Sequence, residues 1–413
     1  MPKPMPKREQ FSSQVAWNDF CDDLKQLGAK ITDPTGARNG RERAEGYRYL
    51  VRLLSAAHEL EMEVDRRHPV LARMMTPTRK FKGDGTDTIY HEAKLDETLS
   101  YKVTVRRGDD IFFSSTVYAF DEHGSYKIVD TLFDRDIVFR NVFGLEIADI
   151  HLSAERPSGV ENWLRLEGRD PILFMREYFP ECLLAADAGR YRKAIYDIEC
   201  LSEVAIPDAL TESELEAGLR RVVAFMEDAT DVSIGLSIFA GLNLVEYEKT
   251  KAGRRAVATH ITEGQLVLDD ERDDDYTPEE LAKLIDPKLV ANNLPGPGLQ
   301  YLGGWFKIAD DEAILISGHD VPCRYWSCQI LSRYLESGDF RYHTVGINNR
   351  QVELAEDGSF EIYACPSNPG VANWISTQGY SNAHILIRTL LADPLMEASF
   401  SVVKLSEIPV SRP

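Results

Sequence analysis

Two carboxylates and an imidazole lie close together in the last third of the sequence. Glu336 and Asp339 are three residues apart, and His343 follows four residues later. Two neighbouring carboxyl groups can share a proton, so that one serves as general acid while the other stays ionised. A histidine titrates near neutral pH and can act as a base. We therefore predict that these three residues are catalytic, with an exposed loop of salt bridges as the alternative interpretation.

Side chains that could hold a small polar substrate surround these three. Arginine, amide and aromatic groups occur together there, a combination typical of clefts that bind sugars or carboxylates. The expected chemistry is that of a hydrolase or lyase that needs no metal and no other cofactor. The predicted substrate-binding residues are Arg324, Tyr325, Trp326, Arg341, Tyr342, Asn348, Gln351 and Arg388.

Motifs for other chemistries are missing from the sequence. It contains no Gly-x-Ser-x-Gly elbow, P-loop or His-Glu-x-x-His pattern. The six cysteines are scattered, and Cys323 and Cys328 have no second pair at zinc-site spacing, so we expect buried thiols. The acidic run 269–275 is interpreted as a solvated loop, with a calcium site as the alternative, because it lacks the ligand spacing of an EF-hand.

The elements that must position these residues come from a duplicated module. Gly159-Val160-Glu161-Asn162-Trp163 reappears as Gly370-Val371-Ala372-Asn373-Trp374. Several matches in the same order indicate one domain used twice. The other matching positions are Phe112 to Ser114 with Tyr325 to Ser327, and Arg176 with Arg388, each arginine ending an apolar run.

The repeated Asn-Trp loop is interpreted as structural. Its glycine permits a positive φ, its asparagine can satisfy the backbone of a tight turn, and its tryptophan can close the end of a sandwich. A packing solution persists in both copies of a fold, whereas an active site usually survives in one. We therefore expect structural roles for Asn162, Trp163, Asn373, Trp374 and Arg176. For Arg388, burial beside a carboxylate or loop carbonyls is the alternative to substrate binding.

Hydrophobic periodicity divides the chain into four parts. Apolar residues at helical spacing predict an N-terminal helical arm or cap over 1–85. Alternating strands and turns predict β-sandwiches over 86–205 and 299–413, each the size of a jelly roll. Capping boxes beginning at Thr211 and Thr277 predict a helical connecting segment over 206–298. The fold class is therefore mainly β with helical additions, built as two tandem jelly-roll-like sandwiches.

Composition narrows the classes of partner. A net charge of −20 over 413 residues argues against nucleic acid, because phosphate binding needs a basic surface. No apolar run approaches the ~20 residues of a membrane span. The lysine-containing N-terminus has no apolar segment of a secretory signal behind it. We expect a cytoplasmic protein without a membrane partner.

Several short motifs of the second unit carry a family resemblance. They are Gly303-Gly304-Trp305-Phe306, Cys323-Arg324-Tyr325-Trp326, Glu336 with Asp339, Asn348 with Gln351, and Pro369-Gly370 with Asn373-Trp374. In these positions the unit resembles the bacterial family named domain of unknown function 1214. The first unit is similar to the region that accompanies this domain, except that Glu177 stands where relatives carry the glutamine of an Arg-Gln-Tyr-Phe pattern. The resemblance implies a double jelly-roll-like fold, examples of which are trimers with ligand sites between subunits, and it implies no particular reaction.

The leading functional expectation is a homo-oligomeric enzyme that acts on a small polar or sugar-like substrate. Its cleft would lie on the second sandwich and would be closed by the middle helices or by a neighbour's N-terminal arm. One alternative is a non-catalytic module that binds glycan or assembles, which glycan would stabilise without turnover. The other is a protein with an apolar pocket for a lipid or steroid.

Overall fold

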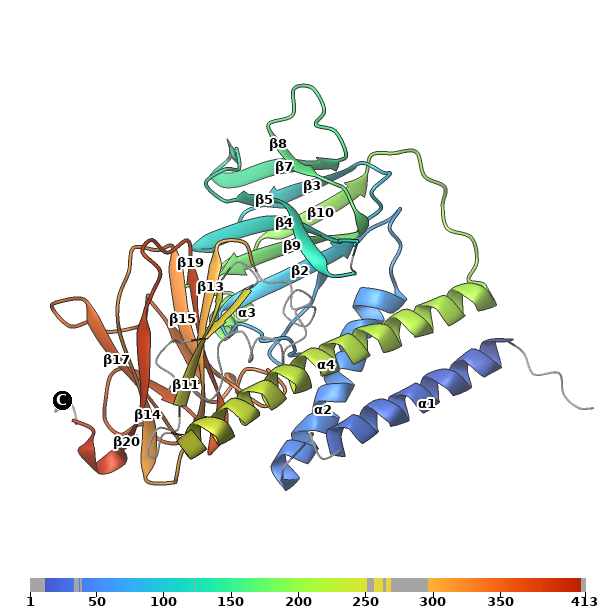
Figure 1. Ribbon diagram of the computed structural model, residues 1–413. Coiled ribbons are helices and arrows are strands. Elements are labelled where there is room, and N and C mark those ends of the chain that lie inside the picture. Colours follow the sequence, from blue (N-terminus) through green and yellow to red (C-terminus); the bar gives the residue numbers. More distant parts are fainter. Residues whose placement is uncertain are drawn as a thin grey trace, which may run out of the picture.

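The fold consists of an N-terminal helical part and two β-sandwiches (Figure 1). The computed structural model describes residues 12–32, 37, 39–122, 124–250, 256–262, 265–268 and 296–409. The expected fold class, mainly β with N-terminal helices and two tandem sandwiches, is confirmed. The acidic run 269–275, the helix expected after Thr277 and most of the predicted linker before Gly298 lie outside the described residues.

The helical part consists of three α-helices and a π-helical turn. They are α1 (Ser12–Thr32), α2 (Gly40–Ala57), η1 (His58–Met62) and α4 (Glu212–Thr250). Helix α4 lies alongside α1 and α2 (Figure 1), and Leu27 and Tyr49 share one apolar core with Met226. The predicted capping box starts α4, since Thr211 Oγ1 accepts from the Glu214 N–H at 3.2 Å. No helix of the described residues is long and apolar enough to cross a membrane.

The first sandwich has sheets in the orders β1-β2-β9-β4-β5 and β10-β3-β7-β6, with β8 paired to β7. Apolar side chains of both sheets, Val103 and Leu173 among them, fill the space between them. Its elements are β1 (Ala72–Arg73), β2 (Thr88–Lys94), β3 (Tyr101–Arg106), β4 (Phe112–Phe120), β5 (Tyr126–Phe133), β6 (Arg140–Val142), β7 (Leu145–Ser153), β8 (Asn162–Arg165), β9 (Arg169–Tyr178), α3 (Leu183–Asp187) and β10 (Ile195–Cys200).

The second sandwich has sheets in the orders β12-β11-β13-β19-β15-β16 and β18-β17-β14-β20. Two of its strands, β11 and β12, come from the segment that we expected to be helical throughout. Val257, Thr259 and Ile261 alternate there, a β-branched period of two that favours a strand. The elements are β11 (Ala256–Thr262), β12 (Gln265–Leu268), β13 (Leu299–Lys307), β14 (Glu312–His319), β15 (Tyr325–Leu331), β16 (Gly346–Asn348), β17 (Ser359–Cys365), β18 (Trp374–Ser376), β19 (Asn382–Leu390), β20 (Ala398–Lys404) and η2 (Leu405–Glu407).

Strand pairing confirms the internal duplication. The order β2-β9-β4-β5 corresponds to β13-β19-β15-β16, and β10-β3-β7-β8 corresponds to β20-β14-β17-β18. The register is kept as well, because each repeated arginine lies between the same two residue types on its neighbouring strands. The matching cross-strand sets are Tyr90, Arg176 and Ser114 in the first unit and Tyr301, Arg388 and Ser327 in the second.

The Asn-Trp loop makes the same backbone hydrogen bonds in both copies. Asn162 accepts from the Val138 N–H at 2.7 Å and donates to the carbonyls of Val138 at 3.0 Å and Asp149 at 3.1 Å. Trp163 donates to Ser153 Oγ at the end of β7. The second copy repeats the asparagine bonds: Asn373 with the Glu353 N–H, the Glu353 carbonyl and the Glu361 carbonyl. Trp374 differs from Trp163 in its acceptor, because it donates to the backbone carbonyl of Cys365.

Candidate functional site

The three residues predicted to be catalytic do not form a proton-sharing carboxylate pair. Glu336 is 2% exposed, and its Oε1 lies 2.5 Å from Nη1 of Arg52 on α2. Asp339 is held by its own neighbour Arg341, with N–O distances of 2.8 and 2.7 Å, and His343 is exposed. Burial raises the pKa of Glu336 to about 7, whereas the hydrogen bonds from Arg341 lower the pKa of Asp339 to about 2. Each carboxylate therefore has a separate arginine, which is the salt-bridge arrangement of the alternative interpretation, and the catalytic role stays a prediction.

Three of the predicted substrate-binding residues instead join the second sandwich to the first unit. The Tyr325 hydroxyl donates to Asp87 Oδ1 at 2.6 Å, and Asn348 Nδ2 donates to Asp87 Oδ2 at 2.8 Å. Arg324 Nη2 lies 2.7 Å from Asp134 at the end of the first sandwich. These side chains form hydrogen bonds with polar groups of the same chain. The residue types that suit such bonds are also those of a binding cleft, so the sequence suggested a cleft here.

Asp87 belongs to a stretch, residues 80–88, that we call the docking segment. Lys80 Nζ donates to the carbonyls of Ser337 at 3.1 Å and Gly338 at 2.6 Å. Asp84 accepts from the Ser337 N–H and hydroxyl at 2.7 and 2.6 Å. Burial lowers the pKa of Lys80, and the nearby carboxylates of Asp84 and Glu336 oppose that effect. None of the predicted site residues lies in this segment, although its dense run of polar residues beside glycines is a usable sequence signal.

The remaining predicted substrate-binding residues lie in different environments. Trp326 is fully buried in the second core, and its indole donates to Asp320 Oδ1 at 2.7 Å. Gln351 Oε1 accepts from the Asn348 N–H within the same turn, and Tyr342 is 77% exposed. Arg341 is paired to Asp339, and among these substrate-binding predictions Arg388 is the described residue that has a buried side-chain atom without a hydrogen-bond partner.

Arg388 and its counterpart Arg176 form the centre of the strongest candidate site. Each is 3% exposed on the middle strand of its sheet. Arg388 Nη2 donates to the carbonyls of Gly83 and Asp84, but its Nη1 has no hydrogen-bond partner and no carboxylate of the described residues forms an ion pair with it. Arg176 Nη2 donates to the Tyr118 hydroxyl at 3.0 Å. The hydrogen bonds of Arg388 thus go to neutral backbone carbonyls, and the nearby Asp87 carboxylate interacts with its positive charge without a hydrogen bond between them.

Tyrosines from both sandwiches lie around these two arginines. Burial raises the pKa of Tyr90, and the positive charges of both Arg388 and Arg176 oppose that rise, so one hydroxyl is within electrostatic range of both guanidinium groups. The Arg388 guanidinium lies 6.0 Å from the Tyr301 ring centroid. We call this set the arginine–tyrosine centre; its members are Arg176, Arg388, Tyr90, Tyr118, Tyr178 and Tyr301.

Contacts between the two sheets fix the arginine–tyrosine centre in place. The rings of Tyr178 and Tyr325, one from each sandwich, are 4.8 Å apart, and Leu299 and Leu390 pack in the same cluster. A site built on central strands and aromatic contacts holds its polar groups in fixed positions before any ligand arrives. The sequence signal for it was available, since Tyr90 and Tyr301 stand at matching positions of the repeat.

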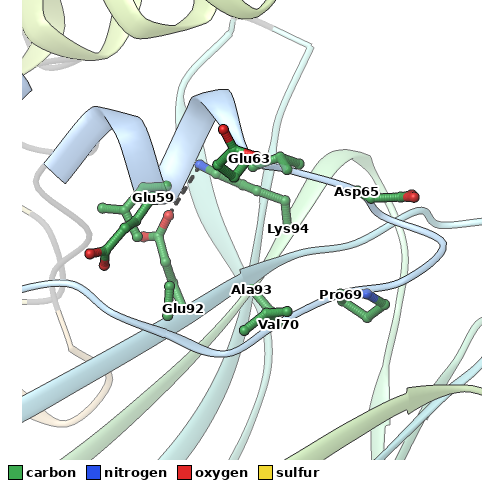
Figure 2. A pocket seen from close by; sticks show the side chains of 11 residues that line it. Glu59, Glu63, Asp65, Pro69, Val70, Glu92, Ala93 and Lys94 are labelled. Atoms are coloured by element: carbon green, nitrogen blue, oxygen red, sulfur yellow. Dashed lines mark ion pairs between the residues drawn. The ribbon is translucent and has the colours of Figure 1, made fainter. Parts of the chain in front are cut away.

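A separate acidic pocket of about 300 Å³ lies beside η1 and β2, and no residue predicted from the sequence lines it (Figure 2). Its charges are largely paired within the protein. Lys94 Nζ lies 3.0 Å from Glu61 and 3.4 Å from Glu92, and Glu59 lies 3.0 Å from Arg79. Burial raises the pKa of Glu92, and the positive charge of Lys94 opposes it. Because these charges already have partners, the pocket makes a weaker case for an ionic ligand than Arg388 does.

A first testable prediction concerns Glu177 and the pH dependence of the free energy of unfolding. Burial raises its pKa from 4.5 to about 7, although the Ala194 N–H and the Tyr196 hydroxyl donate to it at 2.6 and 2.8 Å. The folded state therefore binds the proton more tightly than the unfolded state, and wild-type stability falls as pH rises from 4.5 to 7. Glu177→Gln should remove this loss, because glutamine can accept from Ala194 and donate to Tyr196.

We expect Glu177→Gln to stabilise the protein by roughly 1–3 kcal/mol at pH 8 and to have little effect at pH 4. Urea unfolding at both pH values measures the difference. An equal change in the free energy of unfolding at the two values would contradict the assigned cause.

The fold and the centre define a class: a tandem β-sandwich protein with two equivalent buried arginines, both within electrostatic range of Tyr90. Residues 313–394 match the family described as "Protein of unknown function (DUF1214)", so the resemblance noted in the sequence is confirmed over that stretch. No curated protein matches the chain.

Two solved structures are similar over nearly the whole chain. An uncharacterized protein from Burkholderia cenocepacia is 25% identical, with 96% of this chain and 98% of that chain covered and a TM-score of 0.77. The VPA0106 protein from Vibrio parahaemolyticus is 13% identical, with 94% and 99% covered and a TM-score of 0.46. The first of these shares the fold of both sandwiches and the helical part.

Proposed function

We propose that the protein binds a small molecule bearing a carboxylate at the arginine–tyrosine centre. The observation that carries the proposal is the Arg388 Nη1 group, a buried donor of a permanently charged side chain without a hydrogen-bond partner. Leaving such a donor unsatisfied costs about 1–3 kcal/mol, more when it is charged. A carboxylate would satisfy the donor and the charge together, and tyrosine hydroxyls could donate to its second oxygen.

Carboxylate binding is favoured over the acid–base mechanism expected from the sequence. That mechanism needs Glu336, Asp339 and His343 to act on one substrate. Glu336 and Asp339 are instead paired with Arg52 and Arg341, and His343 is exposed. A glycan-binding function has less support, because the aromatic rings of Tyr325 and Trp326 are buried and are not presented to a sugar.

Thermal unfolding with acetate, succinate, citrate and benzoate at pH 7 tests the proposal, with sodium chloride matched for ionic strength. A ligand present at 100 times its Kd should add about 2.7 kcal/mol of stability. We expect at least one carboxylate to raise the Tm of the wild type. Arg388→Met should weaken that ligand at least tenfold in isothermal titration, since charged hydrogen bonds contribute about 1.5–3 kcal/mol.

Two further variants separate binding from folding. Arg341→Met makes the same change at a surface arginine and should leave the affinity as in the wild type. Tyr301→Phe removes one hydroxyl of the centre and keeps the ring, so we expect weaker binding with the fold preserved. Wild-type protein that binds none of these carboxylates, or Arg388→Met protein that binds as tightly as the wild type, would overturn the proposal.

A further inference from the structure

The hairpin that joins β6 to β7 carries an exposed apolar tip. Val142 lies opposite Leu145, so Phe143 and Gly144 form a two-residue turn. Phe143 is fully exposed, at 102%, and Val142 and Leu145 are each 40% exposed. Neighbouring apolar side chains that stay in water are typical of a surface that meets a partner.

The backbone of the turn gives a second reason to regard Phe143 as functional. Its φ is +52° and that of Gly144 is +84°. Turns with positive φ at both positions favour Asn-Gly, and a left-handed backbone costs a bulky residue roughly 1–2 kcal/mol. Neither burial nor backbone preference therefore explains a phenylalanine at this position.

The second copy of the sandwich serves as an internal control for this hairpin. The Asn162 side chain forms hydrogen bonds with Val138 and Asp149, the residues at the two ends of the hairpin. Asn373 forms the equivalent bonds with Glu353 and Glu361. The intervening chain is thus three residues longer in the first copy, 11 positions against 8. The shorter loop turns at a polar Asp357-Gly358 step. The apolar extension is therefore an addition to the first copy and is not needed to build the sandwich.

Arginines flank the apolar tip on the outer face of the sheet. Arg106 and Arg140 both lie opposite Ile147, and Arg106 also lies opposite Ile195, which is 58% exposed. Arg140 also forms an exposed ion pair with Asp149 at 2.7 Å, which a partner carboxylate would have to share or replace. Residues directly opposite each other, or two apart on a strand, share a face. We call this patch the hairpin surface; it consists of Arg106, Arg140, Val142, Phe143, Leu145 and Ile195.

A groove of about 680 Å³ between α1 and α4 is complementary to this patch. Ala16, Phe20, Leu219 and Val223 contribute its apolar lining. Its acidic residues are Asp19, Asp22, Asp23 and Glu216; Lys25 pairs with Asp22 and Arg220 with Glu216, and no described residue forms an ion pair with Asp19 or Asp23.

We propose that the hairpin surface of one copy of this chain seats in the α1/α4 groove of a second copy. Phe143 would enter the apolar lining, and Arg106 and Arg140 would face Asp19 and Asp23. Figure 1 shows β7 at the top of the first sandwich and α1 on the other side of the molecule, so a chain cannot fill its own groove. Two different surfaces that meet in this way form a head-to-tail contact, which closes into a ring or continues as a chain.

Sedimentation velocity of the full chain between 1 and 100 µM tests the contact. We expect the wild type to associate and Phe143→Asp to shift the midpoint of association at least tenfold upward in concentration. Aspartate tolerates a positive φ better than phenylalanine, so the turn is kept. Leu354→Asp changes an exposed apolar residue, 44%, in the equivalent loop of the second copy and should associate like the wild type.

Reversing one charge on each side of the contact tests whether the α1/α4 groove is the surface that binds the hairpin. Arg140→Glu should weaken association, and Asp23→Lys in the same chain should restore it at least in part. A wild type that stays monomeric to 100 µM would overturn the proposal. So would association that Phe143→Asp leaves intact, or an Arg140→Glu defect that Asp23→Lys does not relieve.

Discussion

Replacing Asp87 by alanine should destabilise the protein by roughly 3–5 kcal/mol, as expected when two buried donors lose their acceptor and a cavity is left. Asp87 is 2% exposed and accepts from Tyr325 at 2.6 Å and from Asn348 at 2.8 Å. Burial raises its pKa, and those two hydrogen bonds oppose the rise. Urea unfolding at pH 7 measures the loss.

A double-mutant cycle between Asp87→Ala and Tyr325→Phe separates docking from ligand binding. Residues in direct contact commonly show interaction energies of about 0.5–3 kcal/mol. We expect coupling in that range and no effect of Tyr325→Phe on carboxylate affinity beyond that of lost stability. Loss of affinity in a Tyr325→Phe protein of normal stability would instead support the substrate-binding role predicted from the sequence.

The two loop asparagines should be equally important for stability. Each makes three hydrogen bonds with backbone groups, and Asn162 and Asn373 are 4% and 8% exposed. Alanine at either position should cost about 3 kcal/mol, since each lost bond contributes about 1 kcal/mol and the stranded backbone groups add to the cost. Urea unfolding of both variants should give values within about 1 kcal/mol of each other.

An asymmetric result would contradict the structural interpretation of the repeat. If only one asparagine affected stability, the identical hydrogen bonds would not be the cause. Asn162→Asp and Asn373→Asp serve as near-isosteric controls. They keep the acceptor but lose both donors, so they should be destabilising as well.

The repeat was the part of the fold that the sequence revealed most directly. Asn162 and Asn373 have the same local task, and residues with a local backbone role recur at the same place in each copy. Strands β11 and β12 were missed because capping boxes before and after them favoured a helical interpretation. Helix α4 lies within the segment that was expected to be helical.

The site was predicted less well than the fold, because residue types alone do not distinguish a partner within the chain from a ligand. Arg324, Tyr325 and Asn348 have the residue types of a binding cleft, but a docked segment of the same chain uses the same hydrogen-bonding groups as a ligand would. Their partners, Asp134 for Arg324 and Asp87 for the other two, lie 190 to 261 residues away in sequence, so spacing could not reveal them. Arg388 was predicted to bind substrate, with a buried structural role as the alternative, and its ligand stays a proposal.

The position of β13 affects how the chain can be divided for experiments. The stretch that matches the family model starts at residue 313, after β13, and ends at residue 394, before β20. Yet β13 lies between β11 and β19, and β20 borders β14. A fragment cut at those limits would expose the backbone edges of β19 and β14 to pairing with other molecules. The smallest piece worth expressing therefore extends past both limits and includes residues 80–88, which means that the boundaries of a sequence family and of a foldable unit differ here.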